Sequence, residues 1–182
     1  MIIACTIDTP LGVMLAAAVE EQRRNGGAAL CGLWFMGQKH FPPNASEWIT
    51  EPDLPVFIKL RDWLGRYFLK EKKLPALPLA PGGTAFQQSV WMLLKEIPYG
   101  VTTSYGDIAK KIIMNSVNSS IPPARPYMAR AVANAIGHNP ISIIIPCHRV
   151  IGADGALRGY AGGIERKRAL LELENSSIQP EK

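Results

Sequence analysis

The stretch Ile141-Ser142-Ile143-Ile144-Ile145-Pro146-Cys147-His148-Arg149-Val150 carries an apolar run directly into a polar motif. The run is too short for a helix and therefore predicts a buried strand over residues 141–145. A cysteine at the end of such a strand, between a proline and a histidine, has a rigid approach, an adjacent base and partial shelter from water. We therefore predict that Cys147 is a reactive thiol, because Pro, His and Arg are unusual neighbours for a cysteine that only packs.

Helical periodicity surrounds this motif on both sides. Apolar residues recur at helical spacing in residues 86–97, 108–113 and 128–136, and a last helix is expected over about residues 164–174. Ser104, followed three positions later by Asp107, resembles a capping box for a helix that begins near Tyr105. Two short helices joined by a connector predict a helix-turn-helix, so we expect a mainly helical, winged-helix-like second half.

The first third of the chain has the pattern of a small sheet. Residues 2–7, 13–19 and 28–35 are strand-like and are separated by turn residues, which predicts antiparallel strands. Apolar spacing in residues 54–68 predicts one helix packed on that sheet. Residues 74–83 hold three prolines and two adjacent glycines, which favours a linker. The predicted fold class is therefore α+β, with an N-terminal domain 1–80 and a C-terminal domain 81–182.

Charge and cysteine content narrow the class of protein. The chain of 182 residues has a formal net charge of +5, and residues 81–182 hold eleven basic against seven acidic side chains. A polyanion, if one binds, should therefore contact the second half. Cys5, Cys31 and Cys147 are an odd number at wide spacing, which indicates reduced thiols and not a disulfide framework. We expect no secretory signal and no membrane-spanning run.

The motif resembles a known active-site signature. Pro146 to Val150, preceded by Gly137-His138-Asn139-Pro140-Ile141, is similar to the signature of the O6-alkylguanine-DNA alkyltransferases. The resemblance covers residues 83–174 strongly and the N-terminal part loosely. Further blocks follow in the family's order: Gly83-Thr84-Ala85-Phe86-Gln87, Ile97-Pro98-Tyr99-Gly100, Thr103-Ser104-Tyr105-Gly106, Ala129-Arg130-Ala131-Val132 and Gly159-Tyr160-Ala161-Gly162-Gly163. The resemblance implies DNA repair by direct reversal of damage, in which an alkyl group moves from O6 of guanine to a cysteine of the protein.

The resemblance also implies a role for each residue of the catalytic site. Cys147 matches the alkyl acceptor, whose thiolate displaces guanine from the alkyl carbon. His148 matches the base that takes the thiol proton through a water, and Glu174 matches the carboxylate that orients this histidine. Tyr105 matches the hydroxyl that donates to the departing base. Asn139 matches the turn-former that braces the cysteine loop.

Double-stranded DNA containing O6-alkylguanine, with O4-alkylthymine as a candidate, is the partner that the resemblance implies. The damaged base must be flipped out of the stack, and Arg130 matches the side chain that fills the vacated place. Small neighbours at Ala129 and Ala131 would let this helix approach the minor groove closely, where sequence readout is weak. The residues that match the substrate pocket are Pro146, Val150, Tyr160 and Ala161.

The product of this chemistry is a thioether, and nothing in the sequence offers a way to cleave one. The resemblance therefore implies one turnover per molecule, and we expect a monomer without a cofactor. It would work in the cytoplasm, or in the nucleus if the source is eukaryotic. Cys5 and Cys31 lie inside apolar runs and are assigned to packing. Together with His40 they lack close-paired spacing and a clear fourth ligand, so we expect no metal site.

The connector between the two DNA-binding helices is where the sequence departs most from the family. From Tyr105 to Arg130 the chain is longer than usual by roughly ten residues, against the short turn of a helix-turn-helix. Asn, Ser and Pro over residues 114–127 predict an exposed loop. A tolerated insertion is the plainer explanation, since lengthening a loop costs little. The functional alternative gives Arg125 an additional contact with a DNA phosphate.

Two other functions stay open on the sequence alone. One is a helix-turn-helix protein that recognises alkylated DNA without chemistry. The other is a thiol hydrolase that pairs Cys147 with His148. Adjacent residues on a regular strand point to opposite faces, so a direct pair would require a turn at this site.

Overall fold

The structure is a computed structural model that describes residues 1–20, 27–116 and 125–174. Contacts between Cα atoms group the chain into two compact units. The first comprises Met1–Gly82 together with Pro140–Ile144, and the second comprises Gly83–Asn139 and Ile145–Lys182. The combination of a sheet-and-helix unit with a mainly helical unit confirms the α+β fold class. The division into domains 1–80 and 81–182 stays a prediction.

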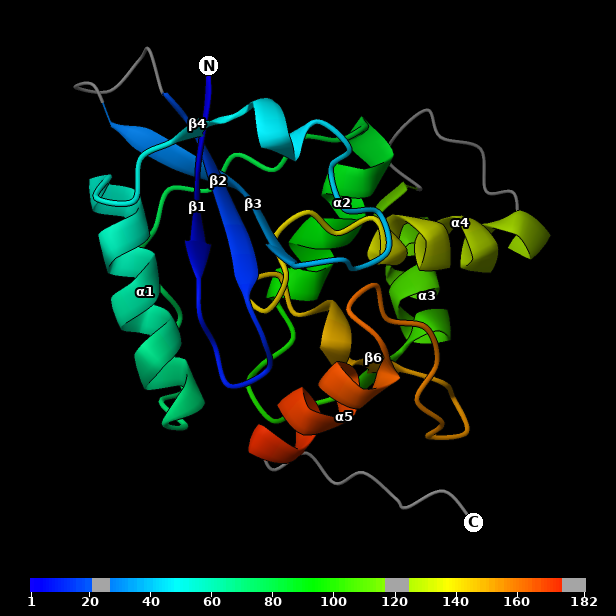
Figure 1. Cartoon of the computed structure of the whole chain (residues 1–182). Coiled ribbons are helices and arrows are strands. Elements are labelled where there is room, and N and C mark those ends of the chain that lie inside the picture. Colours follow the sequence, from blue (N-terminus) through cyan, green and yellow to red (C-terminus); the bar gives the residue numbers. More distant parts are fainter. Residues whose placement is uncertain (21–26, 117–124, 175–182) are drawn as a thin grey trace. The chain divides into compact units, whose positions relative to one another are not determined.

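The described part of the first unit is built on a four-stranded sheet with the strand order β3-β2-β1-β4 (Figure 1). Strands β1 (Ile2–Ile7), β2 (Met14–Glu20) and β3 (Ala28–Phe35) are antiparallel and lie within one residue of their predicted bounds. The short β4 (Ile49–Thr50) follows a 3-10 turn, η1 (Ala45–Glu47), and runs parallel to β1. Helix α1 (Pro55–Phe68) packs against β3 and buries one apolar face, as its periodicity predicts.

The two cysteines of this unit differ in their surroundings. The register between β2 and β3 pairs Ala17 with Gly32 and Ala18 with Leu30, so Cys31 is the extra residue of a β-bulge. Cys31 is half-buried, whereas Cys5 in β1 is 2% exposed and fits the packing role assigned to it. Burial raises the pKa of the Cys5 thiol to about 11 and also raises the pKa of Cys31. Both thiols are free and stay protonated at neutral pH.

The segment Pro140–Ile144 lies along the outer edge of β3. The N–H of Leu33 donates to the carbonyl of Pro140 (2.8 Å), and the N–H of Ser142 donates to the carbonyl of Leu33 (2.9 Å). The predicted strand over residues 141–145 is therefore wrong, because only Ile141 forms a bridge and residues 142–144 form a turn. The predicted burial is confirmed, since residues 141–145 are all at most 4% exposed. Apolar content indicates burial and not the direction of the chain, so it did not reveal the turn.

Three helices pack together in the second unit: α2 (Ala85–Lys95), α3 (Tyr105–Ser116) and α4 (Arg125–Gly137). The indole N–H of Trp91 in α2 donates to the carbonyl of Ala135 in α4 (2.9 Å). At the start of α3, Ser104 Oγ accepts the N–H of Asp107 (3.1 Å), which is half of the predicted capping box. The Asp107 carboxylate instead accepts from the Ser104 hydroxyl (2.7 Å).

The rest of this unit leads to the cysteine motif. A 3-10 turn, η2 (Cys147–Arg149), is followed by β6 (Val150–Ile151), which pairs in parallel with β5 (Thr103–Ser104). A loop then leads into the last helix, α5 (Ile164–Leu173). In Figure 1 this loop, drawn in orange, extends from β6 before the chain turns back to α5.

The loop predicted over residues 114–127 is shorter than expected at both ends. Helix α3 continues to Ser116 and α4 already begins at Arg125. The buried face of α3, which includes Ile108 and Ile112, stabilises the helix beyond the point where its Asn and Ser content would end it. The remaining connector, residues 117–124, and the side chain of Arg125 lie outside the described residues. Within the described ranges, no helix combines the length and the apolar character needed to cross a membrane.

Candidate active site

Cys147 is the first residue of turn η2 and is held by the side chain of Asn139. Asn139 Nδ2 lies 3.1 Å from Cys147 Sγ and donates to the carbonyl of Ile145 at 2.7 Å. The amide therefore ties the end of α4 to the cysteine turn, and Asn139 itself is 4% exposed. A bracing role of the kind predicted for Asn139 requires contacts such as these two, and the role itself stays a prediction.

The thiol of Cys147 is sheltered, with 5% of the residue exposed. Burial raises its pKa, while the Asn139 amide, the Lys167 ammonium and the backbone N–H groups of Cys147 and His148 act in the opposite direction. The net effect is a raised pKa, so the resting group at neutral pH is the thiol. A reaction that needs the thiolate must therefore remove this proton with a base.

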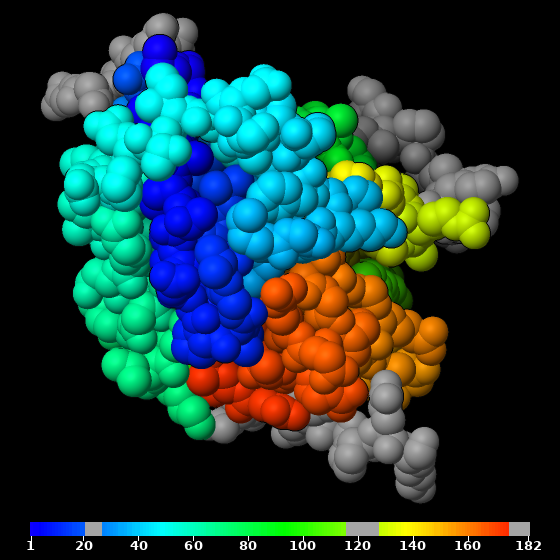
Figure 2. Space-filling view, viewed as in Figure 1, coloured from blue at the N-terminus to red at the C-terminus, as the bar shows by residue number. Residues whose placement is uncertain are grey.

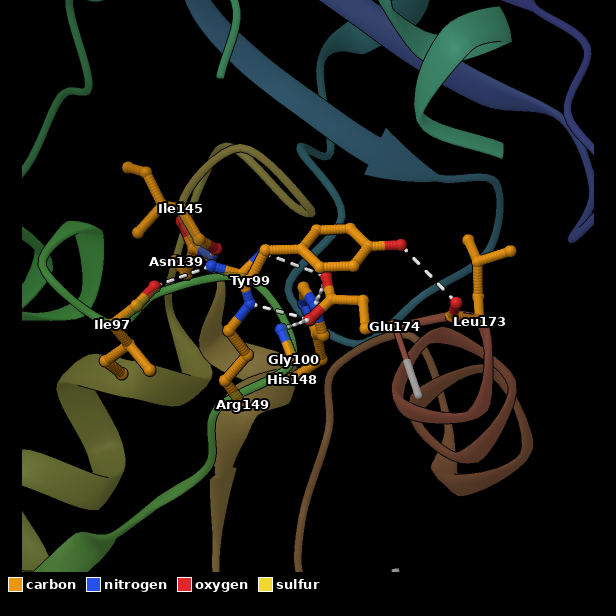
Figure 3. A network of polar contacts seen from close by, with 9 residues as sticks. All are labelled: Ile97, Tyr99, Gly100, Asn139, Ile145, His148, Arg149, Leu173 and Glu174. Atoms are coloured by element: carbon orange, nitrogen blue, oxygen red, sulfur yellow. Dashed lines mark hydrogen bonds and ion pairs between the residues drawn. The ribbon is translucent and has the colours of Figure 1, made fainter. Parts of the chain in front are cut away.

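The side chains of His148 and Arg149 converge on Glu174, the residue that follows α5 (Figure 3). His148 Nε2 lies 2.9 Å from Glu174 Oε1, and Arg149 Nε and Nη2 donate to Oε2 and Oε1 at 2.8 and 2.9 Å. The N–H of Gly100 donates to Oε2 at 3.2 Å. The second guanidinium edge of Arg149 donates to the carbonyl of Ile97 (2.6 Å). Burial alone would raise the pKa of the Glu174 carboxyl, but the hydrogen bonds from His148 and Arg149 and the positive charge of Arg149 hold it far below its usual range, so the carboxyl is ionised.

This arrangement fixes the protonation of His148. The imidazole is fully buried, and burial lowers its pKa more than Glu174 raises it, so the ring is neutral at pH 7. Because an ionised carboxylate only accepts hydrogen bonds, the single ring proton lies on Nε2. Nδ1 is then a lone-pair acceptor, and it makes no hydrogen bond with the described residues. A neutral histidine with a free acceptor nitrogen, one residue from a protonated thiol, has the properties of a general base.

Tyr105 and Lys167 form a second cluster beside the thiol. The Tyr105 hydroxyl donates toward the carbonyls of Arg158 (2.8 Å) and Gly159 (3.2 Å). Lys167 Nζ donates to Val150 O (2.6 Å) and to the same two carbonyls (2.7 and 3.4 Å), and lies 5.7 Å from the centre of the Tyr105 ring. Burial, together with the charge that Cys147 can carry, raises the pKa of Tyr105 to about 12. Tyr105 therefore stays a hydrogen-bond donor at neutral pH.

The predicted site residues fall into two groups. Cys147, Asn139, His148 and Glu174 are joined directly or through one neighbour, and Tyr105 lies close enough to interact electrostatically with the thiol. The predicted DNA-binding residues of α4 (Ala129, Arg130 and Ala131) are exposed, and no described hydrogen bond links them to the thiol. Of the predicted pocket residues, Pro146 and Val150 are buried, whereas Tyr160 and Ala161 are half-buried.

Sequence reasoning missed Lys167 and gave no role to Arg149. Lys167 lies in the charged run Glu165-Arg166-Lys167-Arg168, which reads as a solvated helix face, yet it is fully buried. The available signal was helical spacing, because Lys167 shares a face of α5 with Leu170, Leu171 and Glu174. Burial lowers the pKa of Lys167 to about 8, and the charge of Cys147 opposes this shift.

Metal-ligating residues do not gather elsewhere in the described ranges. No group of three or more His, Cys, Asp or Glu side chains there is arranged to hold a metal ion. The ionisable groups at the site are instead paired with each other or with the backbone. The buried thiol of Cys147 and the neighbouring His148 have the groups needed for proton transfer and nucleophilic attack by sulfur.

The site defines a class of protein in which a buried thiol in a 3-10 turn lies beside a histidine–carboxylate pair and a group of packed helices. The sequence model described as "6-O-methylguanine DNA methyltransferase, DNA binding domain" matches residues 85–176. Curated relatives carry the name methylated-DNA–protein-cysteine methyltransferase. The relative from Mycobacterium tuberculosis is 46% identical over 171 residues, which cover 94% of this chain and 91% of its own.

Archaeal and structural relatives agree with this match. The protein of that name from Methanosarcina acetivorans is 42% identical over 169 residues, which cover 93% of this chain and 96% of its own. The crystal structure of Mycobacterium tuberculosis OGT in complex with DNA is 44% identical, with a TM-score of 0.76, and covers 94% of this chain and 92% of that one. The chain belongs to the methylated-DNA–protein-cysteine methyltransferase family.

Proposed function

We propose that this protein repairs double-stranded DNA by moving the alkyl group from O6 of an alkylated guanine onto Sγ of Cys147. The thiol proton passes through a water to Nδ1 of His148. The S–C bond then forms as the C–O6 bond breaks, and the electron pair of the broken bond stays on guanine. The Tyr105 hydroxyl donates the proton that completes the restored base and regains one from solvent.

The observation that carries this proposal is a buried thiol at Cys147 next to a buried His148 whose Nε2 contacts Glu174 and whose Nδ1 has no hydrogen-bond partner among the described residues. Glu174 keeps the His148 proton on Nε2 (2.9 Å), which leaves Nδ1 to accept from Cys147. Asn139, at 3.1 Å from Sγ, stabilises the thiolate that results. The thioether product has no leaving group, so each molecule reacts once.

Binding of duplex DNA is assigned to α4. Its exposed face presents Arg130 between the small residues Ala129 and Ala131, which supports close approach to the minor groove and insertion of Arg130 into the stack. A protein that acts on DNA works where the DNA is, so the cytoplasm is the compartment that we propose for it. The additional phosphate contact of Arg125 stays a prediction.

Intact mass spectrometry tests the transfer. After incubation with a duplex containing O6-methylguanine, the protein should gain one methyl group, and digestion should place it on Cys147. Cys147→Ala should gain none while binding DNA normally, and Cys5→Ala should react like the wild type. If the protein binds the lesion but never gains mass, it is a DNA-binding protein that recognises alkylated DNA without chemistry. Repeated turnover on an ester would instead indicate a thiol hydrolase.

The role of Arg130 is tested by changing the substrate. Free O6-benzylguanine needs no extrusion, so Arg130→Ala should react with it at the wild-type rate and should react slowly with the duplex. Equal slowing on both substrates would show that Arg130 supports the site itself and not base flipping.

A further inference from the structure

The loop between β6 and α5 holds Arg158, whose backbone carbonyl and whose side chain both have hydrogen-bond partners. This loop, residues 152–163, is orange in Figure 2 and lies at the molecular surface. The carbonyl of Arg158 accepts from the Tyr105 hydroxyl (2.8 Å) and from Lys167 Nζ (2.7 Å). Its side chain is 63% exposed and donates through Nη2 to Asp154 Oδ2 at 2.5 Å. The backbone carbonyl of Arg158 thus accepts hydrogen bonds from Tyr105 and Lys167, while its guanidinium faces solvent and makes no contact with the thiol among the described hydrogen bonds.

The turn beneath this ion pair is built to hold it. The N–H of Gly152 donates to the carbonyl of Ala156 (2.8 Å), and the N–H of Ala156 donates to Asp154 Oδ1 (3.2 Å). A Cβ atom at Gly152 would lie 2.3 Å from Asp154 Oδ1 and 2.8 Å from Arg158 Nε. Because Gly152 has no side chain, the ion pair between Arg158 and Asp154 can lie directly over this turn. Asp154, held by two partners, keeps the guanidinium in one place.

The guanidinium retains unused hydrogen-bond donors. Only Nη2 is engaged, so Nε and Nη1 of Arg158 make no hydrogen bond within the described residues. Arginine presents five N–H groups in a planar fork that suits phosphate oxygens. An exposed ion pair of this kind contributes little to stability, so the arrangement has no strong structural purpose.

We propose that Arg158 binds a phosphate of the DNA strand that carries the damaged base, and that the Asp154 carboxylate competes with this phosphate for the guanidinium. The proposal rests on the proposed function. A base that enters the site passes the Tyr105 hydroxyl, and Arg158 is joined to that hydroxyl through its own carbonyl. The phosphates that flank the extruded nucleotide are the anions nearest to such a position.

The salt dependence of duplex binding tests this assignment. Arg158→Gln should bind the duplex more weakly at low salt. The slope of log affinity against log salt concentration should be smaller than that of the wild type by the contribution of about one phosphate contact. The ratio of the wild-type affinity for the duplex to that of the variant should accordingly fall about threefold between 50 and 200 mM salt. Arg66→Gln is the matched control, because Arg66 forms an exposed i,i+4 pair with Asp62 (2.8 Å) on α1. It makes the same change in charge and should leave the slope unaltered.

Asp154→Asn gives a test of opposite sign. It keeps an oxygen for the Ala156 N–H and removes the charge that competes with phosphate, so duplex binding should tighten about two- to fivefold. Both variants should alkylate at the wild-type rate with free O6-benzylguanine. A slope for Arg158→Gln equal to that of Arg66→Gln would overturn the proposal. Weaker duplex binding by Asp154→Asn would also overturn the proposal, and so would a slower reaction of Arg158→Gln with the free base. Either result would show that the ion pair serves to stabilise the loop. Failure of the wild type to react with the free base would instead count against the proposed function.

Discussion

Replacing Glu174 by Gln is expected to destabilise the protein strongly and to slow alkyl transfer. Glu174 is 3% exposed, and among the described residues Gly100, His148 and the buried guanidinium of Arg149 donate hydrogen bonds to its carboxylate within 3.2 Å. Glutamine has almost the same shape as glutamate but carries no charge. Its NH2 group replaces one carboxylate oxygen, so that a hydrogen-bond donor then faces the N–H donors of the partners. Arg149 is then left as a buried cation without its counter-ion, which costs about 3–5 kcal/mol of the free energy of unfolding. For a chain of this size, that loss lowers Tm by about 6–20 °C.

Chemical denaturation gives the loss of stability, and single-turnover reaction with free O6-benzylguanine gives the loss of rate. We expect the rate to fall by about 10² to 10⁴, because His148 loses the acceptor that keeps its proton on Nε2. The double variant Glu174→Leu with Arg149→Met removes both charges and should recover much of the stability while staying slow. A loss of stability below about 1 kcal/mol in Glu174→Gln would refute the argument, since exposed pairs already contribute that much.

The same residue predicts how the stability of the wild type depends on pH. The folded-state pKa of Glu174 lies far below its ordinary value, so the unfolded chain binds the proton more tightly. Its contribution is therefore complete above the ordinary pKa of about 4.3 and is lost as pH falls below that value. The stability difference between wild type and Glu174→Gln should narrow in the same acidic range.

Two further predictions concern the surroundings of the thiol. Lys167 titrates at about 8 in the folded protein, below its ordinary pKa of about 10.4. Because the unfolded chain keeps its proton in this window, the wild type should gain about 2 kcal/mol of stability as pH rises from 8 to 10, and Lys167→Met should show no such gain by denaturation at each pH. Asn139→Ala leaves the carbonyl of Ile145 without its donor, which costs about 1–3 kcal/mol, and it should raise the pKa of Cys147 as measured by the pH dependence of thiol alkylation. A thiol pKa in Asn139→Ala equal to that of the wild type would mean that the contact at Sγ does not stabilise the thiolate.

Local patterns in the sequence predicted the regular elements well. The three strands of the first unit and α1 follow from period and turn residues, which act over a few positions. The turn at residues 142–144 could not be predicted in this way, because it depends on Leu33, more than a hundred residues earlier in the chain. Ile143 adopts φ of 70°, a region that a β-branched residue rarely enters and that no local preference would indicate.

The candidate catalytic residues show the same limit. Cys147 and His148 stand out locally by composition, but Glu174 looks like an ordinary surface carboxylate and was placed in the site only by resemblance to the family. Its partners lie 25, 26 and 74 residues away, at Arg149, His148 and Gly100. Contacts over such separations depend on the assembled fold, which the sequence specifies only as a whole.

The pairing of Pro140–Ile144 with Leu33 at the edge of β3 determines what happens when the chain is cleaved between the two stretches of sequence. A protease that cleaves once between residues 82 and 83 separates the two stretches of chain, but the second stretch still carries the five residues that complete the β3 edge of the first. A fragment that begins at residue 83 would leave Ile141, Ile143 and Ile144 without that partner and would expose an aggregation-prone stretch just before Cys147. Co-expression of the two halves, in contrast, restores the partner strand, so complementation of split fragments is the route by which the second half could be obtained in active form.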